Sequence, residues 1–371
     1  MVRSVTVLGG YGTFGGRIAA ALATHPDTVV RVVGRDPSAG TRVARTIGGE
    51  FRACDLAEAA SLRRAIEGAQ IVIHAAGPFQ GNDYRVAELC LEAGTHYLDI
   101  ADARAFVTGI AALDEAARQR GLFVSSGVSS VPAVTHALIC ELRPEFRSID
   151  EIQIALSAGN QNPRGASTIG AILSYLGRPI RVRQDGRWVD RPGWGDARRL
   201  QFPPPVGGRR VHRCDVPDLE LFPDLFGAPT VRFHAGVELD LFNYALSALG
   251  RLRRLGALKR LPRHARLFLR LSLLLDRFGT KNGSLAVWLR GTGRDGKPLG
   301  RQIAIVTDAD GPATPCSPAI VLARKILDGG PPRLGAFPCT GFVALDELMG
   351  HLRPLGIWCV RGGPEGWAPR S

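Results

Sequence analysis

A cluster of glycines near the start of the chain has a spacing that suits one defined chemistry. Gly10, Gly12 and Gly15 fit the pattern G-x-G-x-x-G. In this pattern the glycines permit a tight turn, a close approach of backbone to a pyrophosphate and close packing of a helix on a strand. The spacing therefore predicts a turn that binds a dinucleotide. The residues expected to border the cofactor here are Gly10, Tyr11, Gly12, Thr13, Phe14 and Gly15.

The segments on either side decide between a dinucleotide site and a glycine-rich turn without a ligand. An apolar run from Ser4 to Leu8 precedes the glycines, and an Ala-rich run that ends at Leu22 follows them. This order predicts a buried strand, the turn and then a helix. The N-terminus of such a helix presents N–H groups and the positive end of its dipole to phosphates. The arrangement favours dinucleotide binding.

The end of the second predicted strand bears on which dinucleotide is bound. The strand Val29 to Val33 is followed by Gly34, Arg35 and Asp36. An NAD site normally carries an acid at the strand end, where it accepts hydrogen bonds from the ribose 2′-OH. A guanidinium there instead suits a 2′-phosphate, so Arg35 favours NADP. The alternative is that Asp36 reaches the ribose and Arg35 is solvated.

Two later loops also lie where a cofactor is expected. Asp55 follows the third predicted strand, Glu50 to Cys54, where an acid suits either the adenine amino group or the cap of a helix that begins near Ala57. The fourth predicted strand, Gln70 to His74, ends in a break. Ligands of parallel sheets bind at the carboxyl ends of strands, so this break should border the cofactor. The loop residues expected there are Ala76, Gly77 and Pro78.

Hydride transfer also needs a group that manages one proton, and three residues are candidates. Asp99 and Asp102 follow the fifth predicted strand and lie on the cofactor edge of the sheet, although either could instead cap the next helix. Lys281, in a glycine-containing loop, could pair a carboxylate or carry a proton, although a solvated loop lysine is the ordinary alternative. No group of residues has metal-ligand spacing, and we expect no metal site.

The elements that position these residues fall into two patterns. Six strands alternate with helices up to Ser125, which predicts an α/β fold with a Rossmann-type, doubly wound parallel sheet. Asp-Gly pairs at 185–186 and 295–296 then sit between strand-like runs and predict hairpins. We therefore expect a second, α+β domain with an antiparallel sheet. The expected domains are 1–130, which binds NADP, 131–314, which binds substrate or a second subunit, and 315–371, whose helices return to the first domain.

Composition narrows the class of protein. The 371 residues carry a formal net charge of +13, which suits anionic ligands such as a phosphorylated cofactor. The seven cysteines are scattered and form no C-x-x-C pair, which favours reduced thiols and a cytoplasmic location. Met1 lies almost directly before the first strand, so we expect no signal peptide. We also expect no membrane span and no specific binding of nucleic acid.

The segment 241–278 has two interpretations. It is rich in leucine at helical spacing, and Arg251 to Arg270 contains eight Lys or Arg and no acid. An apolar stripe of this kind faces the protein's own core or a partner subunit, and basic amphipathic helices also lie on anionic membranes. We expect core or subunit contact, with a homodimer as the assembly, in preference to peripheral membrane contact.

With these motifs in view, the chain resembles the saccharopine dehydrogenase-like family of NADP-dependent oxidoreductases. The resemblance rests on the glycine motif with Gly34 and Arg35, and on four further segments. These are Ala76 to Phe79, His96 to Asp99, Gly127 to Pro132 and Asp185 to Val189. It implies a Rossmann domain, a substrate domain and hydride transfer with NADP(H). Family members reduce imines formed between amino acids and carbonyl compounds, and some relatives act on enoyl groups of lipids.

The family resemblance leads to an expected function with two alternatives. We expect an NADP-dependent oxidoreductase that transfers hydride to an imine derived from an amino acid, or to a related unsaturated small molecule. One alternative is a non-catalytic sensor or scaffold that binds NADPH, because the motifs specify binding and not turnover. The other is an enoyl-reductase-like enzyme that acts at a lipid surface. Ala101-Asp102 and Pro132-Ala133 differ from common family pairs near the expected substrate, which argues against saccharopine itself.

Overall fold

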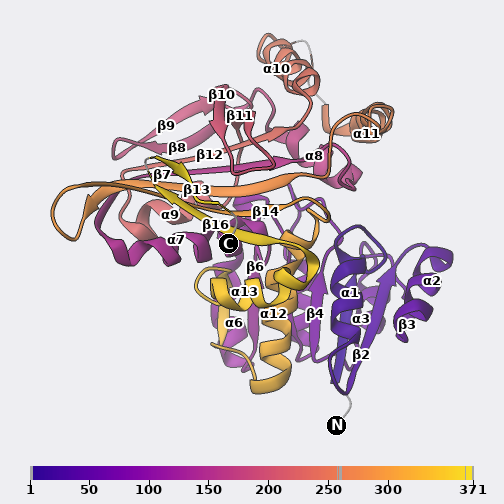
Figure 1. Cartoon of the computed structure of the whole chain (residues 1–371). Coiled ribbons are helices and arrows are strands. Elements are labelled where there is room, and N and C mark those ends of the chain that lie inside the picture. Colours follow the sequence, from indigo (N-terminus) through magenta and orange to yellow (C-terminus); the bar gives the residue numbers. More distant parts are fainter. Residues whose placement is uncertain (1–2, 257, 259–260, 364, 370–371) are drawn as a thin grey trace. The chain divides into compact units, whose positions relative to one another are not determined.

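The chain folds into two compact units. The computed structural model describes residues 3–256, 258, 261–363 and 365–369. The first unit contains residues 1–134 and 312–348, and the second contains 135–311 and 349–371. Figure 1 labels their helices and strands in chain order. Each unit has its own sheet.

The first unit is built on a seven-stranded sheet in which every pair of neighbours is parallel. Its strand order is β15-β6-β5-β4-β1-β2-β3. Strands 3-2-1-4-5-6 have the order of a doubly wound dinucleotide-binding sheet, so the expected fold class is confirmed. The strands are β1 (Arg3–Leu8), β2 (Thr28–Gly34), β3 (Glu50–Ala53), β4 (Ile71–His74), β5 (His96–Asp99), β6 (Phe123–Ser126) and β15 (Gly335–Pro338).

The central strands of this sheet are buried along their whole apolar length. In β1 the residues from Val5 to Leu8 are all buried, and all four residues of β4 are buried. A strand with helices on both faces needs apolar residues in succession and not in alternation, which is the pattern that these segments have. The helices of the unit are α1 (Gly15–Ala23), α2 (Pro37–Ile47), α3 (Ala59–Ile66), α4 (Arg85–Glu92), α5 (Arg104–Gly109), α6 (Asp114–Gln119) and α12 (Ala313–Gly329).

The C-terminal part of the chain is divided between the units. Residues 312–348 belong to the first unit, where α12 packs on α1 and β15 pairs with β6. Residues 349–371 belong to the second unit. Instead of a helical return of the whole segment 315–371, the structure therefore shows a helix and a strand that complete the first unit, followed by strands of the second. α13 (Leu345–Leu352) runs across this boundary in the sequence.

The second unit is built on an eight-stranded mixed sheet with the order β10-β11-β12-β7-β13-β14-β16-β17. β12 and β7 are parallel, and the other described pairs are antiparallel. The second α+β domain is confirmed, with this one parallel pair as an addition. The strands are β7 (Phe146–Ala158), β10 (Arg198–Gln201), β11 (Gly208–Arg213), β12 (Thr230–Val237), β13 (Gly283–Gly293), β14 (Pro298–Thr307), β16 (Trp358–Gly363) and β17 (Gly366–Trp367).

Both predicted hairpins are present. β8 (Pro179–Gln184) and β9 (Arg187–Pro192) form a separate two-stranded sheet around Asp185-Gly186, and β13 pairs with β14 around Asp295-Gly296. α7 packs on β13 and β14, and α9 packs on β12. The helices of the second unit are α7 (Thr135–Leu142), α8 (Ala166–Tyr175), α9 (Asp218–Phe226), α10 (Asp240–Arg254) and α11 (Ala265–Leu273).

Most of the apolar stripe of the leucine-rich segment 241–278 lies outside the core, which corrects one of the two expected placements, although Leu261 and Ala265 are buried. Of its apolar stripe, Leu267, Leu271, Leu274 and Phe278 are exposed, with Leu274 at 72%. Lys259 and Arg260, which contribute to the expected basic run, lie outside the described residues. In the part of the chain that the structure describes, none of the helices is both long enough and apolar enough to span a bilayer.

Candidate functional site

The glycine turn joins β1 to α1 at the carboxyl end of the sheet. A Cβ built on Gly15 would lie 2.2 Å from the carbonyl oxygen of Gly9, so only glycine permits this packing of helix on turn. At Gly12 the nearest atom, again the Gly9 oxygen, would lie 3.2 Å away, so the space beside Gly12 is more open. The turn thus has the bare backbone that a pyrophosphate needs in order to approach.

The first turn of α1 is free of a side-chain cap. Phe14 occupies the capping position and makes no side-chain hydrogen bond there, and the first turn holds no acidic residue. Helix termini leave their first N–H groups without intrahelical partners, and the dipole places positive charge at this end. These features fit an anionic group at the glycine turn.

Tyr11 connects the glycine turn to the end of β2. Its ring covers Gly34 so closely that a Cβ on Gly34 would lie 2.4 Å from a ring carbon. The Tyr11 hydroxyl accepts a hydrogen bond from the backbone N–H of Asp36 at 3.0 Å. A side chain at 34 would displace the Tyr11 ring, and Tyr11 holds in place the backbone that carries Arg35.

Arg35 and Asp36 have different surroundings. The Asp36 carboxylate accepts a hydrogen bond from Ala39 N–H at 3.1 Å and caps α2, which has Pro37 at its first position. Arg35 is exposed. Because Asp36 has a local structural task, the geometry favours the interpretation in which Arg35 meets a 2′-phosphate. The residues around the turn therefore fit NADP.

Asp55 forms a turn. It does not cap the next helix, which was one of the two alternatives for this residue. Its side chain accepts a hydrogen bond from Ala57 N–H at 3.0 Å, and its carbonyl accepts one from Glu58 N–H. The helix that follows begins at Ala59 with Glu58 in the capping position. Contact of Asp55 with adenine stays a prediction.

The loop after β4 lies beside the glycine turn. A Cβ on Gly9 would be 3.0 Å from the Cβ of Ala76, and Ala75 N–H donates to the Leu8 carbonyl at 2.9 Å. Gly77 and Pro78 follow, and the buried Phe79 ring packs edge-on against His74, with centroids 4.9 Å apart. Phe79 thus anchors the loop, and Ala76 is placed next to the expected phosphates.

Asp99, a predicted proton carrier, is fully buried. Its Oδ1 accepts hydrogen bonds from Ser126 Oγ at 2.9 Å, Gly127 N–H at 3.0 Å and Ala101 N–H at 2.9 Å. Burial raises the pKa of Asp99 to about 6, although these donors act in the opposite direction. The contacts show that Asp99 fastens the end of β5 to the turn that follows β6. Direct contact with a substrate stays a prediction.

The other two predicted proton carriers are exposed. Asp102 accepts a hydrogen bond from Gln80 Nε2 at 3.1 Å, so it lies beside the loop after β4. Lys281 belongs to the second unit, in a loop whose Thr280 N–H and hydroxyl both donate to the buried Glu238. The structure thus brings Asp99 and Asp102 into the unit of the glycine turn, and Lys281 into the other.

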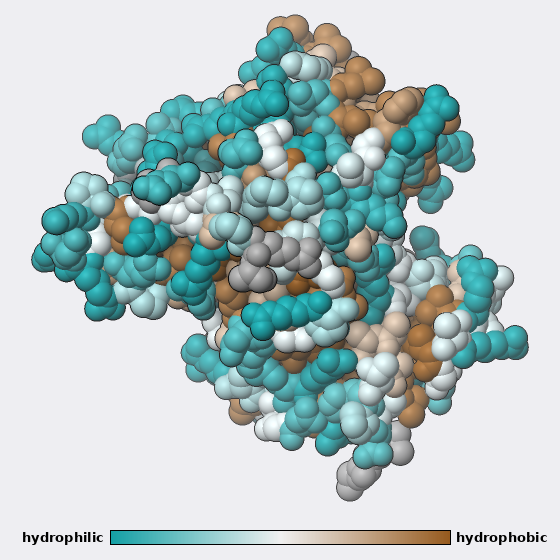
Figure 2. Space-filling model, in the orientation of Figure 1, coloured by the Kyte–Doolittle hydropathy of each residue, from teal (hydrophilic) through white to brown (hydrophobic). Residues whose placement is uncertain are grey.

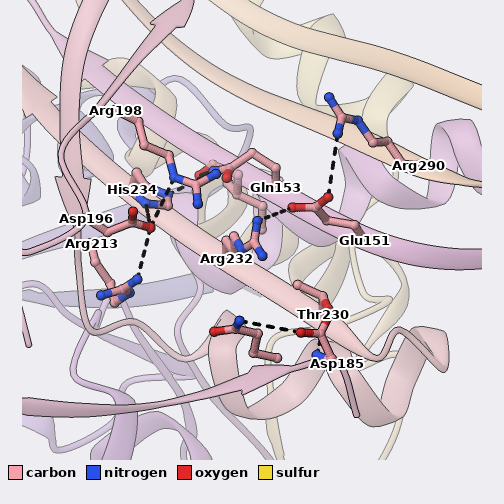
Figure 3. A network of polar contacts seen from close by, with 12 residues as sticks. Glu151, Gln153, Asp185, Asp196, Arg198, Arg213, Thr230, Arg232, His234 and Arg290 are labelled. Carbon is pink, nitrogen blue, oxygen red and sulfur yellow. Dashed lines mark hydrogen bonds and ion pairs between the residues drawn. The ribbon is translucent and has the colours of Figure 1, made fainter. Parts of the chain in front are cut away.

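A polar cluster on the second sheet is a feature that sequence reasoning missed (Figure 3). The fully buried His234 has Nε2 3.1 Å from Asp196 Oδ2, and its Nδ1 lies 3.0 Å from Gln153 Nε2. An amide N–H of Gln153 donates to Nδ1, so Nε2 carries the ring proton and donates to Asp196. Arg198 and Arg213 also pair with Asp196, at 3.1 and 3.0 Å.

The cluster keeps its carboxylate ionised and its ring neutral. The hydrogen bond from His234 lowers the pKa of Asp196 well below its ordinary value, and Arg198 and Arg213 act in the same direction. Burial lowers the pKa of His234. Gln153 comes from β7, Asp196 from the bend before β10, Arg198 from β10, Arg213 from β11 and His234 from β12, so no local sequence pattern could have grouped them.

A pocket of about 310 Å³ adjoins this cluster, a volume at the low end for small-molecule sites. It is lined by arginines, glutamines, one acid and two indole rings. The lining residues that matter here are Glu151, Gln153, Arg198, Arg232, Trp288, Arg290, Gln302 and Trp367. Three arginines against one carboxylate suit a small organic anion, and the indoles offer apolar surface. Within the described residues, no group of three or more His, Cys, Asp or Glu is placed to hold a metal ion.

Comparisons with known proteins agree with this geometry. Residues 5–124 match the family model of the saccharopine dehydrogenase NADP-binding domain. No curated protein matches the chain in sequence. Among solved structures, the chain is similar to apo saccharopine dehydrogenase (L-Glu forming) from Saccharomyces cerevisiae, with a TM-score of 0.70 and 14% identity. That likeness covers 97% of this chain and 99% of the yeast chain and shows a shared fold.

Two further structures are more distant. GenD2 from gentamicin A biosynthesis, solved with NAD, has a TM-score of 0.40 at 17% identity over 80% of this chain and 71% of its own. The putative oxidoreductase yvaA from Bacillus subtilis has a TM-score of 0.38 at 13% identity over 95% of both chains. Such scores are too low to bear on function. Residues 5–124 therefore match a saccharopine dehydrogenase NADP-binding domain, and the chain as a whole shares its fold with the yeast saccharopine dehydrogenase.

Proposed function

We propose that this protein is an NADP-dependent oxidoreductase that transfers hydride to an imine formed between an amino acid and a carbonyl compound. The observation that carries the proposal is the bare glycine turn with Arg35 at the end of β2, braced by Tyr11. The choice of an imine is supported by the fold shared with a saccharopine dehydrogenase and by the carboxylates at the carboxyl edge of the sheet.

The chain's own residues have three tasks in this proposal. The N–H groups at the start of α1 hold the pyrophosphate, and Arg35 holds the 2′-phosphate. When bound, NADPH would supply a hydride to the carbon of the iminium, which is the imine already protonated on nitrogen, and an amine would result. Asp102, exposed at the carboxyl edge beside Gln80, orients the cationic iminium. Asp99, whose pKa burial raises to about 6, is the candidate carrier of the proton on the imine nitrogen, and it holds the turn at Gly127 in place.

A substrate screen tests the proposal. NADPH absorbance is followed across pairs of amino acids and carbonyl compounds, and across enoyl compounds presented in detergent. We expect turnover with an imine-forming pair. Turnover of enoyl compounds alone would show that the substrate carries a carbon–carbon double bond and not an imine. Saturable NADPH binding with no turnover over the whole panel would support the non-catalytic sensor and overturn the enzyme proposal.

The role of Asp102 can then be measured on the substrate that the screen identifies. Asp102→Asn removes the charge and keeps the size of the side chain. We expect kcat/KM to fall roughly a hundredfold with NADPH affinity unchanged, the scale of one lost hydrogen bond between charged groups. Asp346→Asn, at another exposed aspartate of the first unit, is the matched control. Equal activity of the two variants would remove Asp102 from the mechanism and make Lys281 the next candidate.

A second candidate function is reduction of an unsaturated lipid at a membrane surface. The specific observation that favours it is the exposed, leucine-rich surface of α10 and α11. The enoyl arm of the screen tests this reaction.

A further inference from the structure

The exposed apolar residues of this protein are concentrated on one segment. Twelve large apolar side chains are exposed among the described residues, and nine of them lie between residues 241 and 278. We call these nine the α10–α11 surface. They are Leu241, Tyr244, Leu252, Leu255, Leu267, Leu271, Leu273, Leu274 and Phe278. Single exposed leucines are ordinary, but a group of this size marks a surface that contacts something else.

The apolar residues of α10 form one stripe. At about 100° per residue, Leu241, Tyr244, Leu252 and Leu255 fall within a sector of roughly 80°. On α11, Leu267 and Leu271 are one turn apart and share a face. Figure 2 shows hydrophobic residues mixed with hydrophilic ones at the upper right, where Figure 1 places α10 and α11. The helices have the amphipathic pattern, but their apolar faces are not covered.

The two helices are held in this orientation by half-buried hydrogen bonds of two arginines. The Arg253 guanidinium donates to the carbonyls of Leu173, Ser174 and Leu176 at 2.7 to 3.2 Å and fixes the end of α10 to α8. Arg164 donates to the hydroxyl and carbonyl of Ser272 at 2.9 and 2.8 Å and fixes α11. The side of each helix that could pack on the protein is therefore already in use, and the apolar stripe faces outward.

Arginines surround the stripe. The exposed ones are Arg251, Arg254, Arg263, Arg266, Arg270 and Arg277. Only two acids lie among the described residues 240–278, and each faces an arginine from elsewhere. Asp276 pairs with Arg164, and Asp240 lies 3.7 Å from Arg210. The surface thus combines leucines with an excess of positive charge.

The excess of positive charge distinguishes between two possible partners of this surface, a second copy of the chain and a membrane. A second copy of the chain, packed by twofold symmetry, would bring the same arginines against each other. An anionic lipid surface instead pairs with the arginines and takes up the leucines at the level of its headgroups and outer acyl carbons. We propose that the α10–α11 surface docks the protein on membranes that contain anionic lipids. This inference does not depend on the reaction that the protein catalyses.

Flotation with lipid vesicles tests the proposal on the full chain. We expect the protein to float with vesicles of equimolar phosphatidylcholine and phosphatidylglycerol and not with phosphatidylcholine alone, and to be released by high salt. Leu267→Glu with Leu274→Glu should lower the bound fraction at least tenfold. Leu225→Glu with Leu355→Glu is the control, because it places the same charge at two exposed leucines outside the surface.

A second pair of variants separates the position of the charge from net charge. Arg266→Glu with Arg270→Glu should abolish flotation, whereas Arg187→Glu with Arg290→Glu, which changes the net charge equally, should leave most of it. NADP+ affinity of each variant confirms that it folds. Equal flotation of variants and controls would overturn the proposal, as would absence of wild-type binding to the anionic vesicles. Sedimentation measures the oligomeric state of the same proteins. If the wild type does not float but forms a dimer, and the leucine variants are monomers, the surface is a subunit interface.

Discussion

Arg35 and Asp36 stand next to each other at the end of β2, and the structure gives them separate tasks. Asp36 caps α2 through Ala39 N–H, whereas Arg35 is exposed beside the backbone that Tyr11 holds. The carboxylate is thus occupied locally while the guanidinium remains available to a phosphate. We therefore expect the preference for NADP over NAD to depend on these two neighbouring residues.

Replacing Arg35 tests the division directly. Arg35→Ala should weaken NADP+ binding by about 1.5–3 kcal/mol, the scale of a hydrogen bond to a charged group, and leave NAD+ binding nearly unchanged. Calorimetric titration with both cofactors measures this. Asp36→Asn, which keeps a good helix cap, should change neither affinity. If the wild type prefers NAD+, or if Asp36→Asn loses NAD+ binding, then Asp36 accepts the hydrogen bond from the ribose 2′-OH instead.

Asp99 should make stability fall as pH rises. Its folded pKa of about 6 lies above its ordinary value of 3.8, so between these values the folded state holds a proton that the unfolded state has lost. The free energy of unfolding therefore decreases from about pH 4 to about pH 6, by up to about 3 kcal/mol. Asp99→Asn keeps an acceptor for Ser126 and Gly127 and should remove this slope.

Urea unfolding at several pH values measures the difference between wild type and Asp99→Asn. His74, whose pKa burial lowers to about 4, acts in the opposite direction, since its protonation on acidification destabilises the fold. It is present in both proteins and cancels in the difference. Parallel curves for wild type and variant across this range would contradict the assignment of a raised pKa to Asp99.

Among the elements, the glycine turn contains two kinds of glycine. At Gly15 a side chain would meet backbone at 2.2 Å, whereas at Gly12 the nearest atom is 3.2 Å away. Gly15 is therefore required by the packing of α1 on the turn. We expect Gly12 to be required instead by the approach of the pyrophosphate, so that the two positions serve folding and binding respectively.

The two glycines should respond differently to substitution. Gly12→Val should fold and lose NADP+ binding, because its side chain occupies the space of the pyrophosphate. Gly15→Ala should lower stability by more than about 1 kcal/mol, because overpacking forces the backbone to shift. Circular dichroism with chemical unfolding and NADP+ titration separate the outcomes. NADP+ binding by Gly12→Val at wild-type affinity would remove the turn from the cofactor site.

For the whole molecule, the two compact units offer separate reporters of stability. All five tryptophans, Trp188, Trp194, Trp288, Trp358 and Trp367, lie in the second unit, and the glycine turn lies in the first. Tryptophan fluorescence therefore follows unfolding of the second unit, whereas calorimetry follows both. A ligand of the first unit can then be distinguished from a ligand of the second.

NADP+ at a hundred times its Kd should stabilise the first unit by about 2.7 kcal/mol. For a unit of this size the calorimetric transition should move up by roughly 5–10 °C. The midpoint followed by tryptophan fluorescence should move much less. A fluorescence shift as large as the calorimetric one would show that the units unfold together, and a shift in fluorescence alone would place the cofactor on the second unit.

Short-range patterns by themselves determined a large part of this protein. The strand, glycine turn and helix at the start of the chain, and the hairpins at Asp185-Gly186 and Asp295-Gly296, were predictable because each depends on neighbours within a few residues. The alternation of strands and helices then determined the parallel sheet, since a crossover between parallel strands has one strongly preferred hand. The family resemblance and the choice of NADP rested on the same local motifs.

Other features were decided only by tertiary structure, because they join segments far apart in the sequence. β15 and β16 were not predicted as strands, because each is a strand only through its pairing with a distant one. β15 pairs with β6, and β16 pairs with β14. The cluster of His234 with Asp196 and Gln153 depends on the register between β12 and β7. The leucines of 241–278 show the same limit. Their spacing specifies an amphipathic helix, but it does not specify what the apolar face contacts. Contacts such as that of Arg253 with α8 decide this, because they use the opposite side of the helix.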